Sequence, residues 1–318
     1  MKVCVLDSKP ELPLIDLLGG SSGLFSGEVP MIQFTNRSRS EYFLSPHDWW
    51  DIKKDSEYLR YLVSMSRKKR LLLFNRNDFP GRIESSNVVY LQNSIETGSS
   101  TKQIAIIPYN VLEPKSHRYR DYGPNPVISF MGYVPKITIG RVVRSIFPSL
   151  HIISRNSAVV RRLGLIRIQS SFENSQITSN SFYGGARSQI QGVVSEHRER
   201  YIQSMLSSDI VFCPRGDANG SQRLYETLAC GRIPLVPDTR IYLPKNVDWN
   251  DFVAILIHPT MRKLSEVIQN FWACFDDSKY LFAQQLNLNT YESKLRYTSF
   301  MNTMFRAKAS EFESNYVY

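Results

Sequence analysis

The residues of this chain best suited to binding a phosphate lie in the stretch 211–235. Two glycines, Gly216 and Gly220, occupy a loop that follows a short apolar run, and Ser221 then opens a helical segment. The first N–H groups of a helix have no partner within the helix and carry a partial positive charge. A glycine-rich loop that leads into a serine-capped helix is therefore a natural seat for a phosphate.

Arg223 and Glu226 follow on the same helical segment. Because they are three residues apart, they share one face of the helix. A guanidinium suits a diphosphate, and a carboxylate one turn further on can accept both hydroxyls of a ribose. The same two residues could instead form a surface ion pair worth less than ~1 kcal/mol. The stretch is neither a P-loop nor a GxGxxG fingerprint, so spacing alone leaves both interpretations open.

Apolar runs that alternate with helical segments surround this stretch. The expected strands are 2–6, 71–74, 88–91 and 104–107 in the first half, and 127–133, 210–213, 233–236 and 253–257 in the second. Amphipathic helices are expected over 50–69 and 195–209. Such alternation predicts parallel sheets and two doubly wound α/β domains. In these sheets ligands bind beyond the carboxyl ends of the strands, where the loop 214–220 falls.

Length and composition indicate a globular protein of two domains. The chain has 318 residues, of which 42% are hydrophobic, and its net charge is +10. The predicted units are a first domain over 1–112, a linker over 113–126 that is polar and rich in proline, a second domain over 127–290 and a C-terminal helix or tail over 291–318. The positive charge favours anionic partners, but it does not distinguish nucleotide diphosphates, acidic glycans, nucleic acid and membranes.

The four cysteines have no CxxC or Cys/His spacing, and Cys4, Cys213 and Cys230 lie in apolar segments. We therefore expect reduced core thiols instead of a zinc site or a disulfide framework. The N-terminal residues lack the apolar region of a signal peptide, and no stretch reaches the ~20 apolar residues of a membrane span. The expected location is the cytoplasm, with peripheral contact at the inner face of the membrane as an alternative.

The stretch from Tyr201 to Ile257 resembles the nucleotide-sugar-binding part of the exostosin-like glycosyltransferases, of the family-47 type. The ordered matches are Ser207-Ser208, Phe212-Cys213, Pro214, Gly216-Asp217, Ser221, Arg223, Glu226, Gly231, Ile233-Pro234, Leu243-Pro244 and Asp248-Trp249. Upstream, ISFMGY followed by VVRSIF is similar to a further family segment and maps Gly132 and Arg144 onto it.

This resemblance implies a GT-B architecture, in which two Rossmann-like domains face each other and the C-terminal one holds the donor. The implied reaction moves a sugar from a nucleotide-diphosphate sugar, most simply a UDP-sugar, to a hydroxyl of a glycan or lipid-linked glycan. It implies inversion at the anomeric carbon, no metal and no cofactor. A role in surface polysaccharide synthesis, such as that of a capsule, is the expected context.

The resemblance also assigns roles to individual residues. Glu226 would bind the ribose, and Arg223 together with the helix start at Ser221 would bind the diphosphate. Arg144 and Arg215 would neutralise the leaving nucleotide diphosphate. Gly132 and Gly216 complete the donor-binding set; Arg215 could equally be a solvated loop charge.

An inverting transfer needs a general base for the acceptor hydroxyl. The candidates are Asp78, Asp48 and His47, which lie in loops of the first half, and Asp78 is preferred because it follows the clearest buried strand. Each of the three could also be an ordinary cap or turn residue.

Two other classes of function compete with an enzyme. A nucleotide- or glycan-binding protein with the same fold and no base would show the same second half. A nucleic-acid-binding protein is not expected, because the basic residues are dispersed and no recognised motif is present. A dehydrogenase is not expected either, because GxGxxG is missing.

Overall fold

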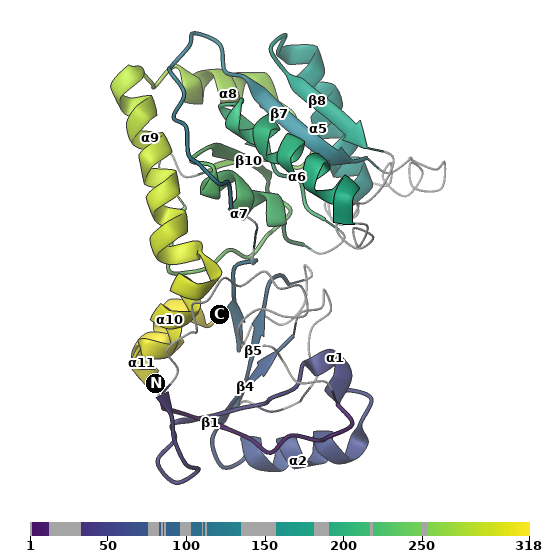
Figure 1. Ribbon diagram of the computed structural model, residues 1–318, viewed down its shortest axis with the longest axis vertical. Helices are drawn as coiled ribbons and strands as arrows, with labels where there is room; N and C mark the ends of the chain where they lie inside the picture. Colours follow the sequence, from purple (N-terminus) through teal and green to yellow (C-terminus); the bar gives the residue numbers. More distant parts are fainter. Residues whose placement is uncertain are drawn as a thin grey trace.

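The computed structural model describes residues 2–12, 33–75, 83, 85, 87–95, 103–109, 111, 113–134, 157–180, 191–216, 219–249 and 254–318. These residues build two parallel β-sheets that follow one another along the long axis of the molecule, each flanked by helices (Figure 1). The predicted α/β class with two doubly wound sheets is confirmed. Within the described ranges, every helix is too short or too polar to cross a membrane.

The N-terminal sheet has the strand order β2-β1-β3-β4-β5-β6, and all of its pairs are parallel. Its strands are β1 (Lys2–Val5), β2 (Gln33–Phe34), β3 (Tyr42–Leu44), β4 (Arg70–Phe74), β5 (Val88–Gln92) and β6 (Ile104–Ile106). The inner strand β5 is buried at every position, as expected of a parallel sheet that is covered on both faces.

Different parts of the chain cover the two faces of this sheet. Helices α1 (Trp49–Ile52) and α2 (Ser56–Ser66) pack on one face. The other face is covered by α10 (Tyr297–Arg306) and α11 (Ala309–Tyr316), which return from the end of the chain. The helix predicted over 50–69 is therefore two helices. They separate because the Asp55 side chain accepts hydrogen bonds from the amides of Glu57 and Tyr58 and starts a new helix.

The second sheet has the order β11-β10-β9-β7-β8 and is also parallel. Its strands are β7 (Ile128–Tyr133), β8 (Gln176–Asn180), β9 (Ile210–Phe212), β10 (Ile233–Pro237) and β11 (Ile255–Ile257). The helices around it are α5 (Ser157–Ser171), α6 (Gln191–Leu206), α7 (Gln222–Ala229), α8 (Leu264–Trp272) and α9 (Asp277–Thr290), followed by a π-helical turn, η1 (Tyr291–Leu295).

Alternating side chains of β9 show how these helices are placed. Ile210 and Phe212 pack with α5 and α8 on one face, and Val211 packs with α6 and α7 on the other. Strand β8 lies within the region 169–192, whose Ser-, Asn-, Gln- and Gly-rich composition predicts a long surface loop. Most of β8 is exposed, as such a loop would be, but it is a regular edge strand that pairs with β7 over five residues despite its polar composition.

The predicted linker, residues 113–126, lies against the second sheet. Arg120 donates through Nε to Asp209 at 2.7 Å, and the Gly123 carbonyl accepts a hydrogen bond from the Trp272 indole at 2.8 Å. Further along, the amide of Val127 also donates to Asp209, at 2.7 Å. Hydrogen bonds therefore hold this part of the chain at the edge where the strands of the second sheet begin, which we call the amino edge.

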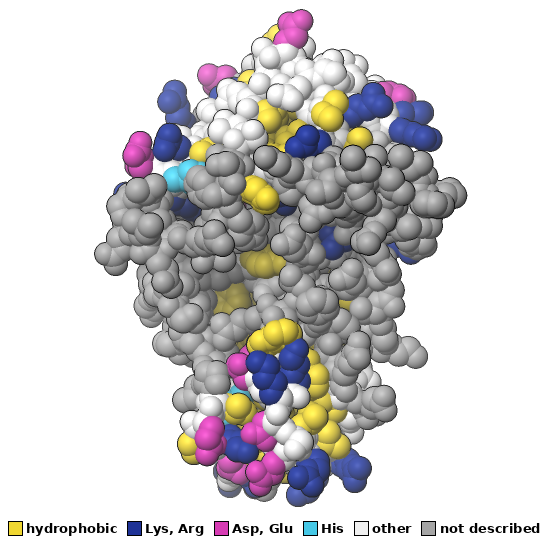
Figure 2. All heavy atoms as spheres, turned by 90° about the vertical axis from the view of Figure 1, so that its right-hand side faces the viewer, with side chains coloured by type: hydrophobic (Ala, Val, Ile, Leu, Met, Phe, Trp, Pro, Cys, Tyr) yellow, Lys and Arg dark blue, Asp and Glu magenta, His cyan; other side chains and the backbone are white. Residues whose placement is uncertain are grey.

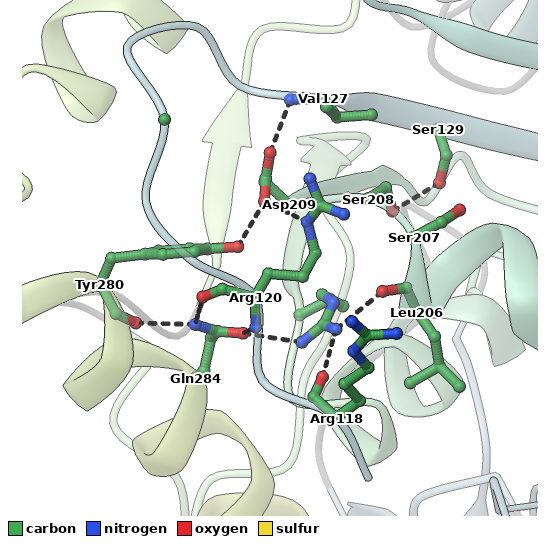
Figure 3. Close-up of polar contacts among 12 residues, drawn as sticks. Arg118, Arg120, Val127, Ser129, Leu206, Ser207, Ser208, Asp209, Tyr280 and Gln284 are labelled. Atoms are coloured by element: carbon green, nitrogen blue, oxygen red, sulfur yellow. Dashed lines mark hydrogen bonds and ion pairs between the residues drawn. The ribbon is translucent and has the colours of Figure 1, made fainter. Parts of the chain in front are cut away.

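Figure 3 shows Asp209 at the centre of the polar contacts at this amino edge, and Arg232 bonds to the same segments. Both are buried, and Asp209 also accepts a hydrogen bond from the Tyr280 hydroxyl at 2.7 Å. Arg232 donates to the carbonyls of Arg118 at 2.6 Å and Leu206 at 2.8 Å. It also donates to the side chain of Gln284, whose amide group bonds the Arg120 carbonyl, so α9, the linker and the sheet are joined.

Candidate functional site

The loop between β9 and α7 lies at the opposite, carboxyl edge of the second sheet, as predicted. The amide of Gly216 donates to the Gly220 carbonyl at 2.9 Å and closes this loop. Asn219 holds it to the segment after β10, because its amide group donates to the carbonyls of Thr239 and Arg240 and its oxygen accepts from the Thr239 hydroxyl at 2.6 Å. The loop is thus fixed at its base by the neighbouring strand.

Ser221 is the N-cap residue of α7, and it has the extended backbone of that position. Its side chain makes no capping hydrogen bond and is buried. The first amides of a helix point out of its start. The predicted position of Ser221 is therefore confirmed, whereas the capping bond usual for serine is not made.

This loop meets the carboxyl edge of the first sheet. A Cβ on Gly220 would lie 2.8 Å from the Tyr109 hydroxyl and 3.0 Å from the Ser94 Cβ, so only glycine allows this approach. Ser94 and Tyr109 follow β5 and β6, and the Tyr109 ring lies 5.8 Å from that of Tyr225 in α7. The carboxyl ends of strands from both sheets therefore face each other at Gly220.

Arg223, in the first turn of α7, reaches across to the end of β7. Its Nη2 donates to the Met131 carbonyl at 2.9 Å, and its guanidinium stacks on the Phe130 ring at 4.3 Å from the centroid. A Cβ on Gly132 would lie 2.6 Å from the same nitrogen. Gly132, predicted as part of the donor site, therefore leaves the space in which Arg223 lies.

Glu226 is 3% exposed, and both of its carboxylate oxygens accept hydrogen bonds. Arg198 donates to Oε1 at 2.8 Å, and the Tyr201 hydroxyl donates to Oε2. The Tyr201 hydroxyl in turn accepts from Arg223 Nε at 3.1 Å. The structure thus brings Arg223 and Glu226 together as predicted, but through Tyr201 of α6.

Burial governs the ionisation of this cluster. It raises the pKa of Tyr201 well above its ordinary value, which keeps the phenol protonated and able to donate to Glu226. Burial by itself would lower the pKa of Arg223, but the neighbouring Tyr201, Cys213 and Glu226 outweigh this effect and raise it. The guanidinium of Arg223 is therefore charged at every physiological pH.

Arg161 adds a further guanidinium beside this cluster, and Arg215 lies in the loop that follows β9. Arg161, in α5, donates to the carbonyls of Tyr133 and Arg215 and so ties the loops after β7 and β9 together. The Arg215 side chain is 2% exposed, so it is not a solvated loop charge. Four arginines, including Arg198 and Arg223, therefore lie around the ends of β7 and β9.

Sequence reasoning did not single out Arg161, Arg198 or Tyr201. Arg161 lies in the segment 157–164, where the sequence pattern favours neither helix nor strand and where the structure has α5. Arg198 and Tyr201 are three residues apart in a helix that the sequence predicts, so the sequence could have shown that they share one helix face. Their partner Glu226 is 28 residues from Arg198, which local spacing cannot reveal.

The two base candidates in the described part of the first domain both hold the local fold. His47 is fully buried, its Nε2 accepts a hydrogen bond from the Lys9 amide at 2.9 Å, and its ring meets that of Tyr58 edge to face. Asp48 caps α1 by accepting from the Trp50 amide at 2.9 Å. Asp78 and Arg144 lie outside the described residues, so a base and this donor-site arginine stay predictions.

The three cysteines that lie in apolar segments of the sequence are all in the core. Cys4, Cys213 and Cys230 are buried free thiols, as predicted, and burial raises the pKa of Cys213 and of Cys230 to about 12. Across the described ranges, no group of three or more His, Cys, Asp and Glu side chains is placed to hold a metal ion.

Three solved structures illustrate what the fold resembles. Anabaena HepE in complex with UDP and glucose is 10% identical, with 83% of this chain and 76% of that chain covered and a TM-score of 0.37. A glycosyltransferase from Rickettsia africae is 11% identical, with 87% and 77% covered and a TM-score of 0.39. MurG of Acinetobacter baumannii is 10% identical, with 81% and 73% covered and a TM-score of 0.34.

Among curated proteins no sequence matches the chain. A family model does match: residues 157–256 fit the RXYLT1 C-terminal domain. This segment contains α5, α6, the loop 213–220 and α7, and with them all four arginines of the site. The match confirms, for residues 157–256, the family that the order of motifs predicts, that of the exostosin-like glycosyltransferases.

Proposed function

We propose that this chain is a glycosyltransferase that binds a nucleotide-diphosphate sugar, most simply a UDP-sugar, at the carboxyl edge of its second sheet. The acceptor is a hydroxyl of a glycan or lipid-linked glycan, bound from the side of the first domain. Synthesis of a surface polysaccharide such as a capsule, in the cytoplasm or at the inner face of a membrane, is the proposed context.

One observation carries this proposal: Arg161, Arg198, Arg215 and Arg223 gather where β7 and β9 end and α7 begins. Guanidiniums form charge-assisted hydrogen bonds with phosphate oxygens, and the start of a helix adds a favourable field. The location is also where parallel α/β sheets bind their ligands. A diphosphate is the chemical group that fits such a setting.

The proposed chemistry needs little more than this electrostatic support. The acceptor oxygen attacks the anomeric carbon, the bond from that carbon to the diphosphate oxygen breaks, and the leaving diphosphate takes up negative charge. Arginines fixed beforehand stabilise that charge, so the proposal includes no metal and no cofactor. Arg144 joins them in the proposal, and Asp78 remains the preferred base for the acceptor proton.

A non-catalytic nucleotide- or glycan-binding protein is the second candidate. The observation in its favour is that His47 and Asp48 both make hydrogen bonds that hold the local fold. This leaves Asp78 as the base candidate that the structure does not describe. A nucleic-acid-binding function is not supported by the face in Figure 2, where basic and acidic side chains are mixed at both ends of the molecule.

Binding and turnover can be tested separately. Thermal shift with UDP, GDP and a panel of their sugars measures binding, because a ligand that binds the folded state raises its stability. Release of free UDP or GDP from the same sugars, with and without glycan acceptors, measures turnover. Stabilisation together with turnover supports a transferase, whereas stabilisation without turnover of any donor supports the binding protein.

Two variants test whether UDP binds at this site. Arg223→Gln removes the charge at the start of α7 and should lower the affinity for UDP by about tenfold or more, which is about 1.4 kcal/mol. Arg200 lies on the exposed face of α6, where its guanidinium is 3.9 Å from the Glu196 carboxylate. Arg200→Gln removes the same charge as Arg223→Gln and should leave the affinity for UDP unchanged. Equal affinity in all three proteins would contradict the proposed site.

A further inference from the structure

The position of Glu226 conflicts with a direct role in ribose binding. The side chain lies on the inner face of α7, and each carboxylate oxygen already accepts a hydrogen bond, from Arg198 or from Tyr201. Each oxygen could accept a second bond, but the side chain is only 3% exposed, so a ribose hydroxyl could reach it only if the side chains that cover it moved. Moving Arg198 or Tyr201 would leave a guanidinium or a phenol without its acceptor, which is costly away from water.

Arg198 is the accessible member of its ion pair. Its side chain is 24% exposed, against 3% for that of Glu226. Helix α6 connects the carboxyl end of β8 to the start of β9, so it begins at the carboxyl edge of the sheet and runs away from it. Arg198 precedes Tyr201 by three residues, and it therefore lies one turn nearer that edge than the tyrosine.

Tyr201 links the two arginines into one unit. The Arg198 guanidinium carbon lies 5.1 Å from the centroid of its ring and that of Arg223 lies 5.6 Å from it. The hydroxyl accepts from Arg223 and donates to Glu226. Glu226 thus fixes Arg198 by an ion pair and Arg223 through the phenol, without reaching the surface itself.

We propose that Arg198 and Arg223 together bind the phosphate groups of the donor, and that Glu226 is a positioning residue that holds both guanidiniums and does not contact the ribose. Two guanidiniums fixed near one aromatic ring suit two linked phosphates, because each presents a planar set of donors. The inference rests on the proposed nucleotide-sugar site. It adds Arg198 to the residues that bind the diphosphate and removes Glu226 from those that contact the donor.

The two roles of Glu226 predict different losses. If Glu226 positions the arginines, Glu226→Gln weakens the contacts to phosphate and leaves the nucleoside contacts intact. The affinity for UDP should then fall about tenfold or more, while the affinity for uridine stays within about twofold. If Glu226 binds the ribose, uridine and UDP should lose affinity by the same factor, and that result would overturn the proposal.

The measurements use the full chain. Isothermal titration gives the affinity for UDP, and saturation-transfer NMR gives that for uridine, since it detects millimolar binding. If the thermal-shift panel selects guanine, GDP and guanosine replace the two probes. A wild-type protein that binds neither diphosphate would contradict the proposed function itself, which is a different outcome from equal losses in the variant.

Arg198 variants test the second half of the proposal and do not depend on how Glu226→Gln folds. Arg198→Gln should lower the affinity for UDP about tenfold, and Arg198→Lys, which keeps the charge but not the planar donor set, should restore part of it. Combining Arg198→Gln with Glu226→Gln should add little further loss, because both changes remove one interaction. Arg200→Gln on the same helix is the matched control. UDP affinity unchanged by Arg198→Gln would overturn the proposal.

Discussion

The two edges of the second sheet both contain arginines that are held by hydrogen bonds, but the exposure and the partners of these arginines differ. At the amino edge, the fully buried Arg232 donates to backbone carbonyls and to Gln284, which come from the linker, α6 and α9. At the carboxyl edge, the partly exposed Arg198 donates to Glu226, and Arg223 donates to the Tyr201 hydroxyl and to a carbonyl of β7.

The difference lies in what each set of bonds joins. The amino-edge bonds join segments that are far apart in the sequence, and they leave Arg232 fully buried. The carboxyl-edge bonds orient guanidiniums beside a loop that faces the other sheet at Gly220. Arg198 and Arg223, which are partly exposed and lie near the other domain, are the arginines that we propose bind a ligand, whereas Arg232 serves the fold.

Asp209→Ala should have the largest effect and should act on stability alone. The carboxylate is buried and accepts hydrogen bonds from Arg120, Val127 and Tyr280. Its removal leaves these donors unpaired and should lower the free energy of unfolding by about 3–5 kcal/mol, as measured in urea. The folded variant should keep its affinity for UDP within about twofold.

The exposed pair Lys263 and Glu266, at 3.6 Å, provides the control. Glu266→Ala should change the free energy of unfolding by less than ~1 kcal/mol. If Asp209→Ala behaved like this control, the amino edge would not hold the fold. A selective loss of UDP binding in Asp209→Ala would erase the distinction between the two edges.

Gly132→Ala should have a smaller effect on stability and a larger one on binding. The added methyl group would lie 2.6 Å from Arg223 Nη2, so the guanidinium has to move away from the Met131 carbonyl. We expect a loss of about 1–3 kcal/mol in the free energy of unfolding. The affinity for UDP should fall about tenfold as Arg223 shifts.

Gly123→Ala is the matched substitution in the linker. There the nearest atom would be 4.0 Å from the new methyl group, so both stability and UDP affinity should stay close to wild type. If Gly132→Ala left the affinity for UDP unchanged, neither Gly132 nor Arg223 would contribute to binding the donor.

Acid should weaken the helix that supports the amino edge. Asp276 caps α9, which contributes Tyr280 and Gln284, and hydrogen bonds from the Lys279 amide first and the Ser278 hydroxyl second lower the pKa of Asp276 to about 2, from an ordinary value of 3.8. A lowered folded-state pKa means that the carboxylate stabilises the fold above about pH 4 and loses this effect as the pH falls toward 2.

Asp276→Asn tests this pH dependence, because asparagine also caps helices but does not titrate. Urea unfolding between pH 5 and pH 3 should show a shallower loss of stability with acid in the variant than in the wild type. Equal slopes in the two proteins would mean that this cap does not contribute to the acid sensitivity of the amino edge.

Much of the fold could be predicted because strands that are buried on both faces read as continuous apolar runs. The runs at 71–74 and 210–213 are examples, and β4 and β9 lie there. Strand β8, with the sequence QITSN, has no such run because it is an edge strand that pairs only with β7. Its pairing depends on contacts that the local sequence does not record.

The candidate site was predictable to the same extent. The order of strand, glycine loop and helix placed Gly216, Ser221 and Arg223 at the carboxyl edge. The partners of Glu226 were not predictable, because Arg198 and Tyr201 reach it from another helix. Local spacing identifies which residues share a face, whereas what that face touches is decided by the packing of α6 against α7.

The return of α10 and α11 to the first sheet has a consequence for synthesis of the protein. Strands β1 to β6 leave the ribosome first, yet the face that carries Leu72, Phe74 and Val89 is covered by Phe300, Met304 and Phe312. During translation of the intervening residues this apolar face has no permanent cover. The core of the N-terminal domain is therefore completed only when α10 and α11 have been synthesised. A nascent chain that pauses before residue 297 exposes an apolar surface of the kind that chaperones bind.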